Sequence, residues 1–224
     1  MASETSQVKT IVTWGAMGFV GALIARSRMP PTVEAMFKFT VGMRISLGLW
    51  LLFSVYWSIA PRNSAATKSS ESWWSRQLHL ILVNGALLLL IFSVPGLTRR
   101  FVPVSSWLVI AGLIVQVTFL LLAVWARQQL GSNWSGEVRI ATGHQLVRSG
   151  PYRFVRHPIY TAVLGMYCGT GLVSGEIHAI VAPVIVTLAY WRKIRLEEDA
   201  LGETFGGEFD AYRRDTWALV PLVY

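Results

Sequence analysis

Residues Gly150–Tyr160 read GPYRFVRHPIY and interrupt a chain that is otherwise mostly apolar. Two prolines, two arginines, a histidine and two tyrosines stand here directly before an apolar segment. Pro158 suits the first turn of a helix, because its missing N–H would be unpaired there in any case. Pro151 stiffens the preceding turn, and Gly150 permits a positive φ. We therefore predict that a membrane helix begins here with a rigid, polar mouth, and that chemistry takes place at this mouth.

The composition of the whole chain is typical of a membrane protein. Of its 224 residues, 53% are hydrophobic and only 14% are charged, whereas a soluble domain carries about 25% charged residues. Ten Trp and seven Tyr suit the two membrane interfaces. A net charge of +8 would indicate nucleic-acid binding in a soluble protein. Here the basic residues cluster in loops, which favours a role in membrane topology and no nucleic-acid partner.

Hydropathy predicts an all-α, multi-pass transmembrane protein. Each long apolar segment approaches the ~20 residues that a helix needs to cross a bilayer. Residues 1–126 form the first part of a single integrated membrane domain, and residues 127–224 form its catalytic region. The four predicted long spans are Val8–Ala25, Phe37–Ala60, Leu78–Val94 and Val104–Ala126.

A shorter pair of apolar segments, Ile159–Val173 and Ile177–Trp191, follows the polar box. Ser174, Gly175 and Glu176 separate the two arms, and each arm reaches only ~22 Å as a helix. We predict a helical hairpin that enters from one side and barely crosses. Both of its flanks then face the same compartment, and a cytoplasmic C-terminal helix follows.

The Lys and Arg distribution predicts the orientation. Fourteen of these residues fall in segments that face the cytoplasm if both termini lie inside, and five fall on the far side. The first apolar run reads as a retained span rather than a cleaved signal peptide. The compact chain favours a bacterial inner membrane over the endoplasmic reticulum. Arg44 lies inside the second span, where it is either functional or extends to the interface.

The hairpin brings two polar segments together, His144–Tyr160 and Trp191–Asp199. We therefore expect His157 to lie near Lys193 and Glu197, which share one helix face because they are four residues apart. A basic rim balanced by an acidic helix explains these charges most simply. It explains less well a Pro-bracketed histidine beside paired carboxylates. Carboxylates at such a mouth can hold ribose hydroxyls or an amino group, and histidine and tyrosine can contact a base.

These residues resemble the isoprenylcysteine carboxyl methyltransferase family of integral membrane methyltransferases, which is related to the phospholipid N-methyltransferases. The resemblance extends from about Gly131 to Val220, and the order and spacing of its elements make it specific. Its elements are His144-Gln145-Leu146-Val147, Gly150-Pro151-Tyr152, Arg156-His157-Pro158 with Tyr160, Glu197-Glu198, Leu201, Phe205-Gly206, Glu208-Phe209 and Tyr212.

The resemblance implies a helical transmembrane fold that binds S-adenosylmethionine without a Rossmann domain. The family often carries an arginine facing the acceptor one turn before the first glutamate. Lys193 stands at that position, keeping the charge but losing the bidentate fork, with Arg192 or Arg195 as alternatives. The cofactor contacts implied are His144, Gln145, Leu146, Val147, Tyr152, His157, Pro158, Ile159, Tyr160, Glu197 and, completing the acidic pair, Glu198.

We therefore predict an S-adenosylmethionine-dependent methyltransferase that acts on a lipophilic acceptor at the membrane face. The leading acceptor is the carboxylate of a prenylated cysteine or a mimic of it. N- or S-methylation of a membrane lipid or a small thiol is the alternative. Methyl transfer from a sulfonium needs no metal. A non-catalytic membrane protein or a transporter is the alternative of another class, but a transporter should show interrupted helices in both halves, and one hairpin is visible.

Overall fold

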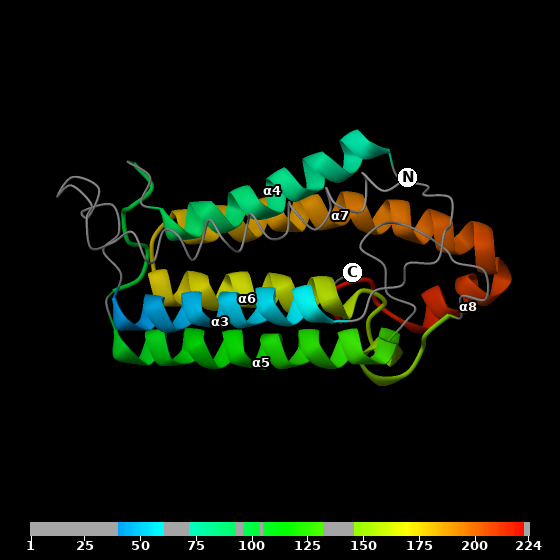
Figure 1. Cartoon of the computed structure of the whole chain (residues 1–224), viewed down its shortest axis with the longest axis horizontal. Coiled ribbons are helices and arrows are strands. Elements are labelled where there is room, and N and C mark those ends of the chain that lie inside the picture. Colours follow the sequence, from blue (N-terminus) through cyan, green and yellow to red (C-terminus); the bar gives the residue numbers. More distant parts are fainter. Residues whose placement is uncertain (1–39, 61–71, 93–95, 104, 132–145, 222–224) are drawn as a thin grey trace.

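A computed structural model of the chain describes residues 40–60, 72–92, 96–103, 105–131 and 146–221 (Figure 1). The first predicted span, Val8–Ala25, lies outside the described residues, as do the predicted cofactor ligands His144 and Gln145. Within the described part the fold is all-helical, with two isolated β-bridges and no longer strand. The predicted fold class is therefore confirmed at the level of a helical protein with several apolar helices.

Among the described residues, three helices have the length and hydropathy to cross a membrane: α3 (Val41–Ile59), α4 (Trp73–Ile91) and α5 (Ser106–Leu130). They correspond to the second, third and fourth predicted spans. α4 begins five residues before the predicted Leu78, because Ser72 caps it by accepting a hydrogen bond from the Ser75 N–H at 3.2 Å. Periodic hydropathy could not reveal this polar first turn.

The C-terminal region contains a short 3₁₀ helix and three α-helices. α6 packs along α5, and α7 continues past the apolar segment into the charged one. Figure 1 shows α3, α5 and α6 side by side, with α4 lying over α7. The elements are η3 (Gly150–Arg153), α6 (Pro158–Ser174), α7 (His178–Phe205) and α8 (Gly207–Asp215).

The predicted hairpin is present, and α6 runs beside α3 and α5 to the opposite end of the bundle (Figure 1). How far the hairpin crosses a membrane stays a prediction. Its turn at Gly175, with φ of 66°, contacts the loop between α4 and α5. The Phe101 N–H donates to the Gly175 carbonyl at 3.1 Å, and the Ile177 N–H donates to the Arg99 carbonyl at 2.9 Å. The 17 residues of α6 reach ~25 Å, which is close to the ~22 Å expected for each arm. The contact between the turn and this loop was not predicted from the sequence.

Small and polar residues hold α6 in register. A Cβ on Gly169 would lie 2.7 Å from the Gly112 carbonyl oxygen, so the backbones of α5 and α6 are in direct contact here. The buried Thr170 hydroxyl lies 3.1 Å from the Ser46 hydroxyl and accepts a hydrogen bond from the Trp50 indole at 3.0 Å. Such interhelical hydrogen bonds contribute about 0.6 kcal/mol each in membrane proteins. Together these contacts fix the position of α6, and hence of the site at its first turn.

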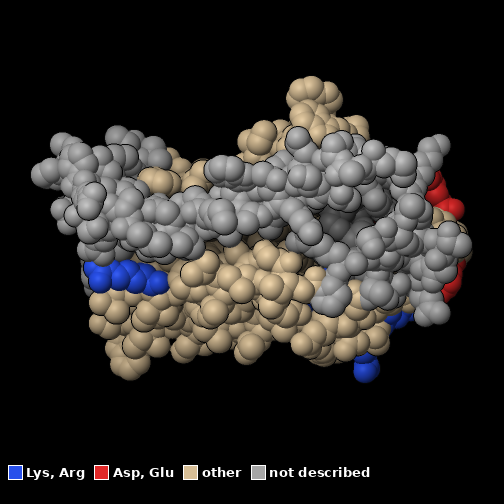
Figure 2. Space-filling model, viewed as in Figure 1, with Lys and Arg blue, Asp and Glu red and all other residues tan. Residues whose placement is uncertain are grey.

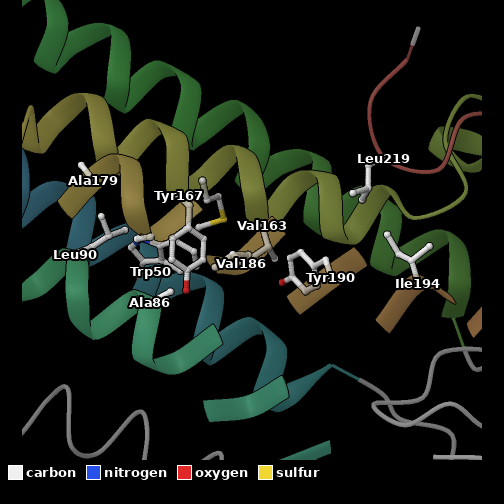
Figure 3. Packing of buried hydrophobic residues seen from close by; sticks show 12 residues of the cluster. Trp50, Ala86, Leu90, Val163, Tyr167, Ala179, Val186, Tyr190, Ile194 and Leu219 are labelled. Carbon is white, nitrogen blue, oxygen red and sulfur yellow. The ribbon is translucent and has the colours of Figure 1, made fainter. Parts of the chain in front are cut away.

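Aliphatic side chains packed around a few aromatic ones fill the centre of the bundle (Figure 3). The Trp50 and Tyr167 rings lie 4.9 Å apart between centroids, nearly edge to face. The Tyr167 hydroxyl donates to the Val83 carbonyl of α4 at 2.7 Å. This cluster joins α3, α4, α6 and α7, and it extends to Tyr190 and Ile194 near the polar mouth.

The outer surface matches a bilayer environment. In the described part of Figure 2, charged residues lie towards the two ends of the long axis, with an uncharged surface between them. Large apolar side chains such as Leu52 of α3 and Leu121 of α5 are exposed. Arg44 is exposed in the first turns of α3, near the hairpin turn. This position suits a side chain that extends to the interface.

Candidate active site

The polar box folds as predicted from its local residues. Gly150 begins η3 with φ of 59°, and a Cβ there would lie 2.7 Å from the Gln129 side chain. Pro158 is the first residue of α6. The two prolines therefore bracket a short, stiff segment that ends at the mouth of a helix, which directs His157 and Tyr160 inward.

A C-terminal segment, residues 216–219, lies against the box and was not predicted. The Arg156 N–H donates to the Trp217 carbonyl at 2.8 Å, and the His157 N–H donates to the Ala218 carbonyl at 3.0 Å. The Thr161 hydroxyl donates to the Leu219 carbonyl at 2.6 Å. These contacts give the N–H groups just before α6 hydrogen-bond partners, and they fix the orientation of His157. The sequence carries no local signal for them, since backbone pairing does not depend on residue type.

His157 is buried between two carboxylates of α7. Its Nδ1 lies 3.4 Å from Glu197 Oε2, and its Nε2 lies 3.3 Å from Glu198 Oε1. The predicted meeting of the box and the charged helix therefore occurs. Because both ring nitrogens face carboxylate oxygens, the arrangement favours the doubly protonated imidazolium.

Tyr160 connects the box to the same helix by a second route. Its hydroxyl donates a hydrogen bond to Glu197 Oε1. Its ring stacks on His157, with centroids 5.6 Å apart and planes 9° apart, and on Tyr190 at 4.4 Å and 17°. Stacking against two rings restricts the Tyr160 ring, and hence the direction of its hydroxyl.

Arg156 also belongs to the site, although it is not among the residues that the sequence predicted to contact the cofactor. Its Nε lies 2.7 Å from Glu198 Oε1, and its Nη1 donates to the carbonyls of Arg213 and Thr216. The guanidinium therefore joins the box, α7 and the end of α8. The only available signal was its place beside His157, which does not reveal the direction of its side chain.

These contacts determine the ionisation of the cluster. Burial disfavours a charge on Glu198, but hydrogen bonds and charge from His157 and Arg156 outweigh it, so its pKa falls to about 2. The pKa of Glu197 is also lowered, because His157, Lys193 and Tyr160 together outweigh burial. For His157, burial opposes protonation, yet the two carboxylates raise its pKa. The contacts therefore favour two ionised carboxylates and a protonated imidazole in the cluster.

Glu197 and Glu198 differ in access. The side chain of Glu198 is 8% exposed and contacts Arg156, His157 and Arg213. The side chain of Glu197 is 24% exposed. A carboxylate has about four lone-pair positions, so Glu197 can accept hydrogen bonds from a bound molecule in addition to those from Tyr160 and His157. Glu198 is better suited to hold the cluster together.

Of the three basic residues considered for the acceptor, one faces the cluster. Lys193 is 4% exposed, lies one turn before Glu197 and lowers the pKa of that carboxyl. Arg192 instead donates to Ser75 of α4. The guanidinium of Arg195 lies over the exposed Trp191 ring at 5.2 Å, so the structure does not bring it to the cluster.

The remaining predicted contacts lie along the same segment. Tyr152 is buried, its carbonyl accepts a hydrogen bond from the Tyr212 hydroxyl at 2.7 Å, and burial raises the pKa of its own hydroxyl. Leu146, Val147 and Ile159 are half-buried. All four are in the described part of the chain, but only Ile159 is directly beside the His157 cluster in sequence.

A family model described as phospholipid methyltransferase matches residues 107–208, which include the box and both carboxylates. The chain is 31% identical over 84 residues to protein-S-isoprenylcysteine O-methyltransferase of Schizosaccharomyces pombe. It is 32% identical over 88 residues to protein-S-isoprenylcysteine O-methyltransferase B of Arabidopsis thaliana. It is 37% identical over 62 residues to the uncharacterized protein YpbQ of Bacillus subtilis.

These matches are partial, covering 36%, 39% and 28% of this chain respectively. They span 34%, 45% and 36% of those relatives, which is less than half of each. A solved structure of the eukaryotic intramembrane Ras methyltransferase ICMT is similar in fold, with a TM-score of 0.50 and 16% identity. That similarity covers 96% of this chain and 97% of the other. The predicted resemblance to the isoprenylcysteine carboxyl methyltransferase family is confirmed.

Proposed function

We propose that this protein is an S-adenosylmethionine-dependent methyltransferase that acts on a lipophilic acceptor at a membrane face. The observation that carries the proposal is the His157–Tyr160–Glu197–Glu198 cluster, which joins the mouth of α6 to the end of an apolar helix. It lies inside the region matched by the phospholipid methyltransferase model. Burying ionised groups at such a place costs free energy, so a cluster of this kind indicates a functional site.

The residues fit the proposed cofactor. Glu197 is ionised and partly accessible, so it can accept charge-assisted hydrogen bonds from ribose hydroxyls or an amino group. Leu146, Val147, Tyr152 and His157–Tyr160 supply apolar and aromatic surface along the box, and His144 and Gln145 complete the proposed set. When bound, S-adenosylmethionine supplies an electrophilic methyl group on a sulfonium.

Lys193 is proposed to hold an anionic acceptor, with the carboxylate of a prenylated cysteine as the leading candidate. In that reaction a carboxylate oxygen forms a bond to the methyl carbon as the carbon–sulfur bond breaks, and no proton is transferred. The chain therefore has to align two reactants and exclude water rather than supply an acid or a base. The buried ammonium of Lys193 beside Glu197 suits this task.

N-methylation of a membrane lipid is the second candidate, because the family model that matches is described as phospholipid methyltransferase. An amine acceptor has to lose its proton before it can attack. While it is protonated, the amine carries the same charge as Lys193, which would repel it. The carboxylate acceptor is therefore favoured.

We also propose that the mouth of α6 faces the cytoplasm. The Lys and Arg bias supports this orientation with both termini inside, and a bacterial inner membrane is the proposed location. A water-soluble cofactor then enters from the cytoplasm, and a lipid-tailed acceptor arrives through the bilayer.

An assay with labelled S-adenosylmethionine tests the proposal. Purified protein in nanodiscs is offered prenylcysteines, phospholipids and small thiols, with Lys193→Ala as the matched variant of reduced activity. We expect label in the prenylcysteine carboxyl ester, and alkaline hydrolysis should release it. Transfer only to phospholipid or thiol would replace the acceptor, and absence of transfer to every acceptor by folded protein would contradict the enzyme.

A further inference from the structure

The outer face of α4 carries two residues that are unusual in contact with lipid. Trp74, Ile81 and Leu88 form this face, and each is more than half exposed. Asn84 and Gly85 are exposed beside them, in the middle third of the helix. An amide needs hydrogen-bond partners in hydrocarbon, and a glycine lowers helix stability and exposes the backbone. Neither residue suits a surface that contacts lipid alone at this depth.

This face points away from the helices that α4 packs against. At about 100° per residue, Trp74 and Leu88 both lie within about 20° of Ile81. The buried Ala86 and Leu90 lie about 140° and 180° from Ile81, on the side that packs on α6 and α7. Figure 1 shows α4 at the outer edge of the bundle, over α7. Another helix can therefore reach the outer face without disturbing the core.

The Asn84 side chain has hydrogen-bonding capacity left over. Its Nδ2 donates to the Leu80 carbonyl of the same helix at 2.7 Å, which uses one of the two N–H groups of the amide. No other described residue forms a hydrogen bond with this amide. By contrast, the exposed Thr118 on α5 donates its single O–H to the Ile114 carbonyl at 2.9 Å. Thr118 has therefore used its donor, whereas Asn84 has a second N–H and an acceptor oxygen for a further partner.

Gly85 leaves room for a close approach of that partner. A Cβ at this position would meet no atom within 4 Å. Inside the bundle, Gly112 and Gly169 allow the backbones of α5 and α6 to touch, as small residues commonly do between membrane helices. Gly85 offers the same kind of contact on the outer face of α4.

We propose that the outer face of α4 is a self-association surface on which two copies of this chain pack as a parallel pair. Copies inserted in the same orientation are related by a two-fold axis along the membrane normal, so each α4 residue lies at the same depth in both. Asn84 lies about 60° to one side of Ile81, and Gly85 lies about 40° to the other side. The axis therefore brings Asn84 opposite Gly85 of the partner subunit.

The missing side chain at that glycine lets the Asn84 amide reach the partner's backbone, where a carbonyl accepts its second N–H. The two-fold axis forms this contact twice, so the surface is complementary to itself and a second copy is the occupant that fits it. The pairing goes beyond the proposed function, since no residue of the His157 cluster lies on α4.

Cysteine cross-linking tests the surface. Ile81→Cys or Leu88→Cys is introduced in a Cys168→Ser background, which removes the single native cysteine. In liposomes at high lipid excess, we expect oxidation to give a disulfide-linked species of twice the chain mass. Ile114→Cys, on the similarly exposed outer face of α5, is the matched control and should stay monomeric.

Monomers from both α4 variants would overturn the proposal, and coverage by lipid alone or by the predicted first span of the same chain would give that result. Equal yields from α4 and α5 would also overturn it, because they would indicate random collision.

The association equilibrium tests the two central residues. Single-molecule photobleaching of labelled full-length protein in liposomes gives the dimer fraction as the protein density is lowered. Asn84→Leu removes two symmetry-related hydrogen bonds, which at the average strength between membrane helices predicts about 5- to 10-fold weaker association. Gly85→Leu should weaken it more, because the added side chain enters the contact twice. Thr118→Leu on α5 is the control and should change association by less than about twofold.

Thermal unfolding in detergent checks the fold of each variant. Because a Cβ at Gly85 meets open space, Gly85→Leu should unfold at the same temperature as the wild type or slightly higher. Wild-type association of folded Gly85→Leu or Asn84→Leu would overturn the pairing. None of these measurements uses a substrate or a cofactor, so their result holds whether or not the protein is a methyltransferase.

Discussion

The two ends of the α6–α7 hairpin each place a buried histidine near glutamate, but they are held in different ways. At the turn, His178 lies 3.4 Å from Glu176, and backbone hydrogen bonds from the 97–101 loop hold the segment. At the mouth, backbone hydrogen bonds with residues 216–219 are joined by a network of ionisable groups, in which His157 lies between Glu197 and Glu198. Backbone pairing does not depend on ionisation, whereas a buried charge network does. The turn therefore fixes the fold, and the mouth remains responsive to ligands and pH.

The largest expected effect is from Glu198→Ala. This change leaves Arg156 and His157 buried without their shared carboxylate, which costs about 3–5 kcal/mol of stability. Glu176→Ala at the turn is the matched control and should cost less than about 1 kcal/mol, because the backbone contacts remain. Unfolding in detergent measures both. Equal losses would show that the two ends are held alike.

Lys193→Ala should impair turnover strongly while leaving cofactor affinity nearly unchanged. Loss of a charged donor at the acceptor predicts a fall of about 10- to 100-fold in kcat/KM. Arg195→Ala is the control, since its side chain lies over Trp191 and outside the cluster. A greater loss in Arg195→Ala than in Lys193→Ala would reverse the assignment of the acceptor residue.

The stability of the mouth should depend on pH in both directions. Glu198 has its pKa lowered from 4.5 to about 2, so its contribution is present above pH 4.5 and is lost as pH falls towards 2. His157 has its pKa raised from 6.5, so its contribution is present below pH 6.5 and is lost as pH rises through the folded pKa. Thermal unfolding of wild type and His157→Asn should therefore differ most on the acid side of that raised pKa. Parallel pH profiles would contradict the network.

Gly175→Ala should have the smallest effect and should act on stability alone. Its φ of 66° disfavours a side chain, and a Cβ would lie 2.6 Å from the Arg100 guanidinium. We expect a loss of about 1 kcal/mol, since Arg100 is exposed and can move. Cofactor affinity should be unchanged. A loss of affinity would show that the turn and the mouth are coupled along α6.

The same comparison shows which features the sequence could predict. Pro158 at the start of α6 and Gly175 at the turn follow from rules about single residues, and both predictions are confirmed. His157 and Glu197 could be brought together because a hairpin joins its own two flanks. The direction of the Arg156 side chain and the pairing of residues 216–219 depend on tertiary packing. The pairing of the 97–101 loop with the hairpin turn does too.

Calorimetry of S-adenosylmethionine binding to wild type and Glu197→Gln tests the central claim most directly. The substitution removes the charge of the accessible carboxylate and keeps its shape. We predict saturable binding to the wild type and a Kd raised at least about 10-fold in Glu197→Gln, because a hydrogen bond to a charged group is lost. Equal affinity of the two proteins, or no binding to folded wild type, would contradict a cofactor site at this cluster.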